Sequence, residues 1–438
     1  MFIPMLLLTA SVALNPDSVS LSLEEAILRA SEMNPTLRAE VAEATAAQQG
    51  PLEASRAFLP SVRMDVQGVR STDPVAAFGL KLRQENFAME DLALDALNRP
   101  DAYSGFTSSV TVEMPILAPE GLFGFAAARR GAAARSAGTR RAAGATTFMV
   151  TMSYWDAQLA AKRVETLQDA LAAARSHADQ AEAMHDQGLV TGLDARMARI
   201  GAAAVETQLL AASAQAENAL SSLRALLAMP DSVPIVLTDS LVDSFGAACE
   251  AEVASCSIGE RGDLEALRLG SSATSAMVKS AWSKNLPSIG VFGNFAHHGR
   301  STPFGTGSGD WTIGVGVRWN VLSALSGFGS VRRANAEHDA ARARQEAAER
   351  QADLEVTSAR RMLAAARERV EVATSADAEG AEALDQARLR YRTGAAPITE
   401  LLDVQAAATA ATLQLFEARR DMFVALAALD FAYGVNDR

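Results

Sequence analysis

Hydrophobic residues follow a helical period at the start of the chain. Between residues 21 and 58 they recur at spacings of three and four, for example at Leu23, Ile27 and Ala30, which predicts an amphipathic helix. Ser22 and Glu25 fit a capping box at the helix start, and Pro60 predicts its end. A first helix over residues 21–58 is therefore expected.

Four later segments alternate between apolar and polar residues, which predicts β-strands over 61–70, 105–117, 287–296 and 310–322. The last strand is the clearest, since the residues on one of its faces are Trp311, Ile313, Val315, Val317 and Trp319. The other face is polar or glycine, so one side suits hydrocarbon and the other suits water, as in a transmembrane barrel strand. A sheet that covers a soluble core fits the same alternation, so both interpretations stay open at this point.

Two very long stretches without proline, 121–187 and 326–392, carry heptad-like patterns rich in Ala, Arg and Glu. At 1.5 Å per residue each helix would be about 100 Å long. Shorter helices are predicted at 193–229 and 398–434. Helices of this length cannot fold into a compact domain, and they predict a layered cylinder of helices.

The chain is a duplication. NPTLRA from Asn34 matches RGDLEA from Arg261, and LPSV from Leu59 matches LPSI from Leu286. The matches predict a first repeat over 14–235, a linker over 236–261 and a second repeat over 262–438. The spacing between matching motifs is longer in the first half, which therefore contains extra residues. Proline, asparagine and aspartate in these residues predict an irregular exposed loop over 71–104.

Charge and hydropathy exclude several classes of function. The net charge is -12 over 438 residues, without a basic stripe, so no nucleic-acid partner is expected. Residues 1–13 predict a signal peptide cleaved after Ala13. No later stretch has the roughly 18 apolar residues of a transmembrane helix, so the chain would cross a membrane as strands.

No chemistry-bearing motif stands out. The sequence has no Ser/His/Asp set in a motif context, no phosphate loop and no zinc spacing, so neither an enzyme nor a bound cofactor or metal is expected. His297 and His298 are expected in an exposed loop just past a strand. Cys249 and Cys256 could form a local disulfide in an oxidising compartment, and a free pair is equally compatible with the sequence.

The order helix, LPS, strand, loop, strand, long helix, glycine turn, helix occurs twice and resembles the TolC family of outer-membrane efflux proteins. The segments that carry the resemblance over nearly the whole mature chain are NPTLRA, FLPSVRM, HDQGLVTGLD and YRTGAAPITELLDVQAA, and AFGLKLRQENF resembles one branch of the family. The resemblance implies a mainly α protein with a small β part. It also implies a homotrimer, in which each chain gives four strands to a twelve-stranded outer-membrane β-barrel and its helices to a periplasmic α-barrel.

The resemblance also implies roles for the two glycine turns. Gly188 and Gly394 would lie at helix-hairpin tips that dock a periplasmic membrane-fusion adaptor. From the residues alone, a glycine at such a reversal supplies a left-handed helix cap, and this structural role stays open beside the functional one.

Four further residues match the family's periplasmic gate. The resemblance implies that Glu400 and Asp403 line an acidic aperture and that Asp194 and Tyr391 form a latch by hydrogen bonding. From the residues alone, Glu400 simply suits the dipole of a helix that begins near Ile398. The chain departs from some family members by having Ala396 where they have an arginine that helps to hold the gate closed.

The function implied is a passive outer-membrane channel, with its helical tunnel in the periplasm, that exports small molecules or metal ions. An inner-membrane RND or ABC pump would drive the export through the adaptor, and outer-membrane lipid would surround the barrel. Two alternatives remain at this stage: the outer-membrane duct of a type I protein secretion system, and a soluble periplasmic coiled-coil adaptor or scaffold. Trp311 and Trp319 on the apolar face of a strand count against the soluble alternative.

Overall fold

The computed structural model describes residues 19–241, 261–319 and 324–437. The expected signal peptide, Cys249 and Cys256, and most of the expected linker lie outside these residues. The chain divides into two compact units, which are described separately. The helical unit contains residues up to 43, 136–265 and from 347 on, and the sheet unit contains residues 44–135 and 266–346.

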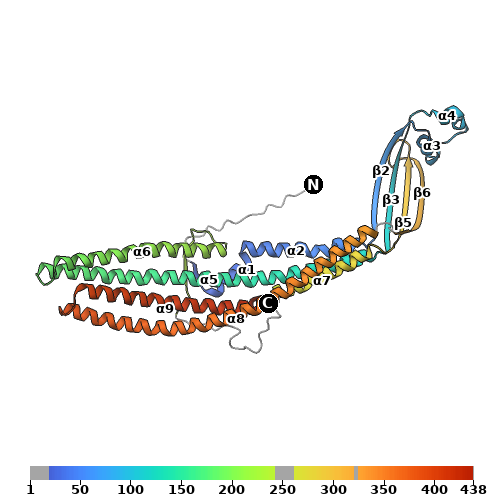
Figure 1. Cartoon of the computed structure of the whole chain (residues 1–438). Helices are drawn as coiled ribbons and strands as arrows, with labels where there is room; N and C mark the ends of the chain where they lie inside the picture. The colour runs from blue at the N-terminus through green and yellow to red at the C-terminus, as the bar shows by residue number, and fades with distance from the viewer. Residues whose placement is uncertain (1–18, 242–260, 320–323, 438) are drawn as a thin grey trace. The chain divides into compact units, whose positions relative to one another are not determined.

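The helical unit is built from two long helix hairpins, which run side by side in Figure 1. Its elements, some of which continue into the sheet unit, are β1 (Val19–Leu21), α1 (Leu23–Met33), α2 (Pro35–Ser55), α5 (Pro119–Asp186), α6 (Gly192–Leu226), β4 (Ile235–Leu237), α8 (Ala324–Arg392), α9 (Ile398–Tyr433) and the 3-10 turn η4 (Val435–Asp437). β1 and β4 form a small parallel pair. None of the described helices combines the length and the apolar composition that a bilayer crossing requires.

The first expected helix is two helices. The capping box is confirmed, since the backbone N–H of Ser22 donates to the Glu25 carboxylate at 2.8 Å. The single helix over 21–58 is wrong, because α1 ends at Met33 and Asn34 caps the next helix with its side chain. That side chain accepts a hydrogen bond from the backbone N–H of Leu37 and donates one to the carbonyl of Leu226.

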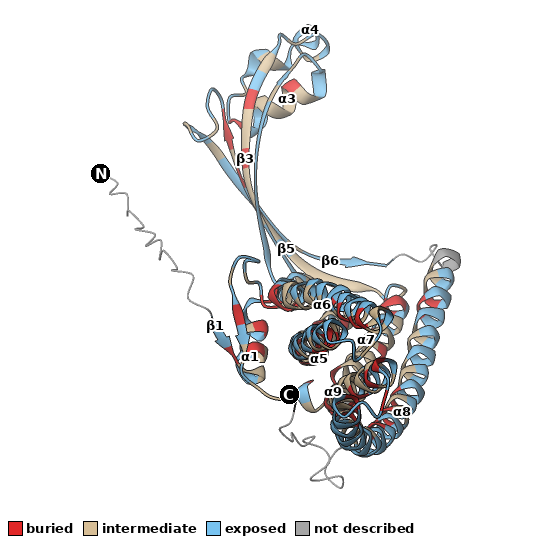
Figure 2. Cartoon of the chain, turned by 90° about the vertical axis from the view of Figure 1, so that its left-hand side faces the viewer, coloured by how far each residue is buried: buried red, intermediate tan, exposed pale blue. Residues whose placement is uncertain are grey.

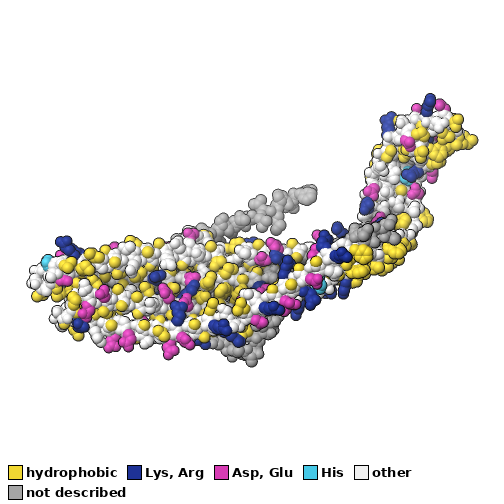
Figure 3. Space-filling view, viewed as in Figure 1, with side chains coloured by type: hydrophobic (Ala, Val, Ile, Leu, Met, Phe, Trp, Pro, Cys, Tyr) yellow, Lys and Arg dark blue, Asp and Glu magenta, His cyan; other side chains and the backbone are white. Residues whose placement is uncertain are grey.

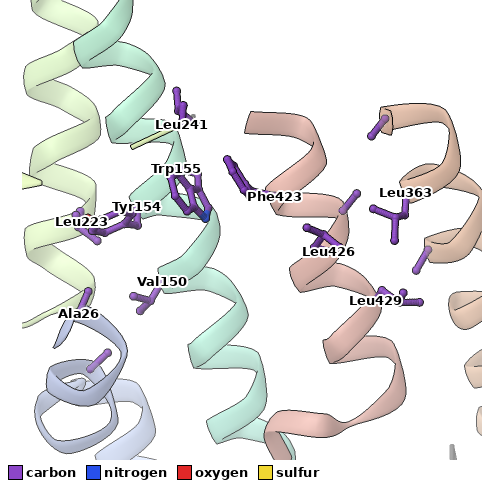
Figure 4. Close-up of a cluster of buried hydrophobic side chains, with 14 of the residues drawn as sticks. Ala26, Val150, Tyr154, Trp155, Leu223, Leu241, Leu363, Phe423, Leu426 and Leu429 are labelled. Atoms are coloured by element: carbon purple, nitrogen blue, oxygen red, sulfur yellow. The ribbon is translucent and has the colours of Figure 1, made fainter. Parts of the chain in front are cut away.

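The core of the helical unit is a cluster of buried aromatic and aliphatic side chains (Figure 4). Trp155 is 1% exposed and stacks on Phe423 with ring centroids 4.4 Å apart. The Tyr154 hydroxyl donates to the carbonyl of Leu21 at 2.9 Å, and burial raises the pKa of Tyr154 to about 12. These contacts attach β1, at the start of the described chain, to the middle of α5.

A buried ion network fastens the end of α9. Arg261 pairs with Asp263 at 2.7 Å and with Glu355 at 2.8 Å. Arg141 donates to the carbonyl of Phe431, and Asp437 accepts from the backbone N–H of Gly262. The several partners of Arg261 offset the cost of removing its charge from water, whereas Oδ1 of Asp437 is buried without a hydrogen-bond partner among the described residues.

The sheet unit holds four antiparallel strands in the order β2-β3-β5-β6. Their bounds are Ser61–Ser71 for β2, Tyr103–Leu117 for β3, Ser288–Gly299 for β5 and Gly307–Arg318 for β6, and α7 (Gly262–Ser283) precedes β5. In Figure 2 most of each strand is exposed or intermediate, whereas buried residues gather inside the helices. The four expected strands are present, with ends that differ from the prediction by at most four residues.

The expected irregular loop over 71–104 is instead partly helical. It contains α3 (Pro74–Arg83), the 3-10 turn η1 (Met89–Leu92) and α4 (Leu94–Asn98). The punctuation that suggested a loop is helix-capping chemistry, since the Asp73 carboxylate accepts from the backbone N–H of Ala76 at 2.7 Å and Pro74 occupies the first turn of α3.

Replacing Trp155 by Ala should lower the free energy of unfolding by about 3–5 kcal/mol, because the change leaves a cavity against Phe423. The measurement is urea unfolding of the detergent-extracted protein followed by circular dichroism. Met149→Ala is the control, since Met149 lies on the same helix but is 39% exposed. Equal losses for the two variants would contradict the assignment of Trp155 to the core.

Candidate functional site: a two-faced sheet and two helix-hairpin turns

Strand register gives the sheet one apolar face. Val315 of β6 pairs with Val291 of β5, which pairs with Met114 of β3. Since directly paired residues point to the same side of a sheet, the apolar side chains of all four strands share this face. Its members are Val62, Met64, Val66, Phe106, Val110, Val112, Met114, Ile289, Val291, Phe295, Trp311, Ile313, Val315 and Val317.

This face is exposed in the single chain. The exposed fractions are 71% for Trp311, 75% for Ile313, 70% for Val315 and 67% for Val317. Trp319, just beyond β6, is 59% exposed, and its ring N–H donates to the carbonyl of Asn285. A continuous apolar surface of this kind on a folded chain marks a contact with lipid or with another protein.

The opposite face is mainly polar, with Phe292 as an exposed aromatic exception. In one row Arg63, Thr111, Asn294 and Thr312 lie side by side on the four strands, and the Asn294 amide donates to the Thr111 hydroxyl at 2.8 Å. The sheet thus separates a surface suited to hydrocarbon from a surface suited to water.

The expectation of an exposed histidine loop is wrong. His297 and His298 lie in β5, and His298 is 4% exposed, with Nε2 2.9 Å from the Asp310 carboxylate and Nδ1 3.1 Å from the Thr107 hydroxyl. The strand continues past residue 296 because β6 begins early enough to pair with it. Within the described part of the chain, no group of three or more His, Cys, Asp or Glu side chains could hold a metal ion.

Both outer edges of the sheet lack a strand partner among the described residues. β2 pairs with β3 alone, and β6 pairs with β5 alone. Such edges present rows of backbone N–H and C=O groups that another strand can complete.

The two glycine turns close helix hairpins in the same way. Gly188 and Gly394 both have φ +73°. After α5 the N–H of Leu189 donates to the carbonyl of Met184, and after α8 the N–H of Ala395 donates to that of Arg390. These are Schellman caps, in which a left-handed residue lets the last carbonyls of a helix find donors. The structural role expected for both glycines is present.

The two carboxylates on α9 differ in their surroundings. Glu400 lies in the first turn of α9 and forms an ion pair with Arg390 of α8 at 3.1 Å. Asp403 is exposed and has no ion pair in the described structure. No sequence pattern predicted the role of Arg390, because the ion pair depends on how α8 and α9 lie together beyond the turn.

The expected latch pair is close but not hydrogen-bonded. Tyr391 is 2% exposed, and its hydroxyl has no hydrogen-bond partner among the described residues. Burial and the nearby charge of Asp194 raise the pKa of Tyr391. The Asp194 carboxylate is engaged elsewhere, since it accepts from the backbone N–H and the hydroxyl of Thr191 in the capping box of α6. Ala396, where some family members have an arginine, is 9% exposed.

The sequence of the chain matches a known protein family. The family model described as "Outer membrane efflux protein" matches residues 26–229 and 254–435, which is one segment in each half of the duplication. No curated protein sequence matches the chain.

Several solved structures share the fold over 94% of the chain. The outer membrane protein VceC of Vibrio cholerae matches with a TM-score of 0.79 at 19% identity over 96% of its own chain. The CmeC outer membrane channel of Campylobacter jejuni matches with a TM-score of 0.80 at 16% identity over 85% of its own chain. The MtrE outer membrane channel of Neisseria gonorrhoeae, in its open state, matches with a TM-score of 0.77 at 19% identity over 88% of its own chain. With the family model covering both halves, the chain belongs to the outer membrane efflux protein family, and it is an outer-membrane channel protein with a helical tunnel in the periplasm, not an enzyme.

Proposed function

We propose that three copies of the chain form a passive duct for small molecules or metal ions. The observation that carries the proposal is the exposed apolar face of a four-stranded sheet with two open edges. Four strands are too few to close a barrel, since about eight are needed even for a filled one. Unpaired edges are not tolerated in hydrocarbon. Three copies supply twelve strands, enough to close the sheet around a lumen lined by its polar face.

Lipid is the partner that best fits the apolar face. Trp311 and Trp319 are eight positions apart, which is about 27 Å along a strand and about 20 Å across a membrane at a tilt of about 40°, close to the apolar band of such barrels. Aromatic side chains gather at both rims of that band. Ile313, Val315 and Val317 would lie between the rims.

The hairpin tips are the proposed contact with a membrane-fusion adaptor and, through it, an inner-membrane pump of the RND or ABC type. Leu189 and Leu193, beside Gly188, are 65% and 68% exposed. Exposed leucines at a tight turn offer a helical partner an apolar surface. The family's outer-membrane placement argues against the soluble-scaffold alternative.

The proposed gate lies at the same tips. Threefold symmetry would repeat Asp403 into an acidic ring that favours cations, while Glu400 is partly neutralised by Arg390. Asp194 and Tyr391 are proposed to form the latch in another state of the hairpins, since the Tyr391 hydroxyl is buried next to a carboxylate and has a hydrogen bond left to donate.

The native mass of protein extracted by detergent from isolated outer membranes tests the assembly directly. We expect three chains per particle, because four strands each complete a twelve-stranded barrel. A monomer recovered in the soluble periplasmic fraction would overturn the duct.

Lysine at both Val315 and Val317 should abolish insertion of the trimer, because each lysine at the middle of a bilayer costs about 2–4 kcal/mol. The measurement is the amount of trimer in outer-membrane fractions. Thr312→Lys is the matched control, since Thr312 lies on the same strand but on the polar face. Normal insertion of the double variant would contradict the lipid-facing assignment.

Asp403→Asn should lower the preference of the channel for cations by about two- to threefold. The readout is the reversal potential across a planar bilayer in a KCl gradient. Glu400→Gln should have a smaller effect because of the ion pair with Arg390, and Glu379→Gln, at an exposed position on α8, should have none. An unchanged reversal potential in Asp403→Asn would remove Asp403 from the aperture.

A further inference from the structure

The inserted segment between β2 and β3 packs against one face of the sheet. Gly105 of β3 alternates with Phe106, which belongs to the apolar face, so the missing side chain of Gly105 would point to the polar side. A Cβ at Gly105 would collide with Gln84 and would come within 3.1 Å of Leu80. Leu80 and Gln84 are at the end of α3, so α3 lies over the polar face.

Gln84 fastens α3 to this end of the sheet. Its amide nitrogen lies 3.4 Å from the carbonyl oxygens of Ser104 and Gly299, and its amide oxygen accepts from the Tyr103 hydroxyl at 3.0 Å. Tyr103, two positions before Gly105, points to the same polar side. The Ser308 hydroxyl donates to the carbonyl of Arg83. β3, β5 and β6 therefore all hold the segment.

The segment is folded in its own right, and residues 73–102 are called the cap below. Lys81 pairs with Asp91 at 2.6 Å, and the rings of Phe78 and Phe87 meet edge to face with centroids 4.9 Å apart. These contacts join α3 to the segment that follows it.

The cap exposes large apolar side chains. Val75, Met89 and Leu94 are 80%, 82% and 77% exposed, and Leu82 and Leu92 are about half exposed. In Figure 3 hydrophobic side chains gather over the α4 end of the sheet unit. Leaving these side chains in water is unfavourable, by roughly 25 cal/mol for each Å² of apolar surface, so a partner surface would stabilise them.

We propose that the apolar cap surfaces of the three copies pack against one another and narrow the outer exit of the duct. This inference rests on the proposed function, because only in a closed barrel with lipid outside does the polar face become the inner wall. A cap held on the inner wall is turned away from lipid, and threefold symmetry brings three identical apolar surfaces toward one axis. The second and third copies are therefore the occupants that fit.

A narrowed exit limits the cargo. In a trimer narrowed in this way, a polypeptide, which is larger than a small solute or an ion, would need the caps to separate. The cap thus favours small-molecule or metal-ion export over protein secretion.

Cross-linking tests the contact between copies. In full-length protein with Cys249 and Cys256 replaced by Ser, Met89→Cys and Leu94→Cys should each give covalent dimers with a short bis-maleimide, since one thiol per chain can join only two copies. Phe304→Cys is the control and should stay monomeric on a denaturing gel. Phe304 is 69% exposed next to Pro303, whose carbonyl accepts from Ser108 on the apolar side of the sheet. Monomers from both cap variants, despite a normal trimer by native mass, would overturn the proposal.

Single-channel conductance tests the narrowing. The double variant Gln84→Ala with Tyr103→Phe removes the side-chain hydrogen bonds of Gln84 to β3 and β5 and should raise conductance roughly twofold, since the narrowest section limits ion flow. Asp95→Asn, a polar change in α4 away from the anchors, should leave conductance unchanged. Unchanged conductance in the anchor variant would overturn the narrowing. Loss of trimers or of channels in every variant and in the wild-type protein would instead refute the proposed function.

Discussion

The outer edges of β2 and β6 carry backbone N–H and C=O groups that hydrocarbon cannot satisfy, and the rest of the molecule is arranged around this constraint. Because the chain contributes only four strands to its exposed apolar face, the proposed trimer completes the hydrogen bonding with strands from other copies. The alternation of side chains then follows from closure, since a closed sheet in lipid has one wet face and one apolar face. The two-faced register across β2, β3, β5 and β6 thus matches what closure of these edges requires.

In the helical unit, very long helices pack together largely through small side chains. Buried positions near the tips include Ala181, Ala195 and Ala198, which let helices approach closely but bury little apolar area each. Larger side chains concentrate instead around Trp155 and Phe423, where β1 and α1 join the helices. The buried ion network of Arg261 and Asp437 then attaches the chain end to this core. Near the tips, Tyr391, Ile398 and Leu401 are also buried among these alanines, so larger side chains hold the hairpins together there as well.

Sequence periodicity was sufficient to predict the main helices and strands, because each of these patterns depends on residues that are close in the sequence. The alternation at Trp311, Ile313 and Val315 and the capping box at Ser22 depend on neighbouring residues alone. The break at Asn34 was missed although its signal is local, since Asn34 is an N-cap residue and Pro35 occupies the first position of α2. The position of His298 was missed because it depends on where β6 begins. The cap was misread as irregular because Asp73 and Pro74 are common to loops and helix starts. For the candidate gate, the residue types could be predicted from the sequence. The ion pair of Glu400 with Arg390 could not, because it depends on the packing of α8 on α9.

The tips show how neighbouring carboxylates can serve different purposes. Glu400 meets both the positive end of α9 and Arg390, so its charge stabilises the hairpin and is largely cancelled at a distance. Asp194 is likewise committed to the N-terminus of α6 through Thr191, and releasing it to Tyr391 would cost part of that cap. Asp403 lies beyond the first turn of α9 without an ion pair in the described structure, so its field extends into solvent. A latch made by Asp194 would therefore exchange its hydrogen bonds with Thr191 for one from Tyr391, and the free-energy difference between the two arrangements sets how strongly a bound partner must favour one of them.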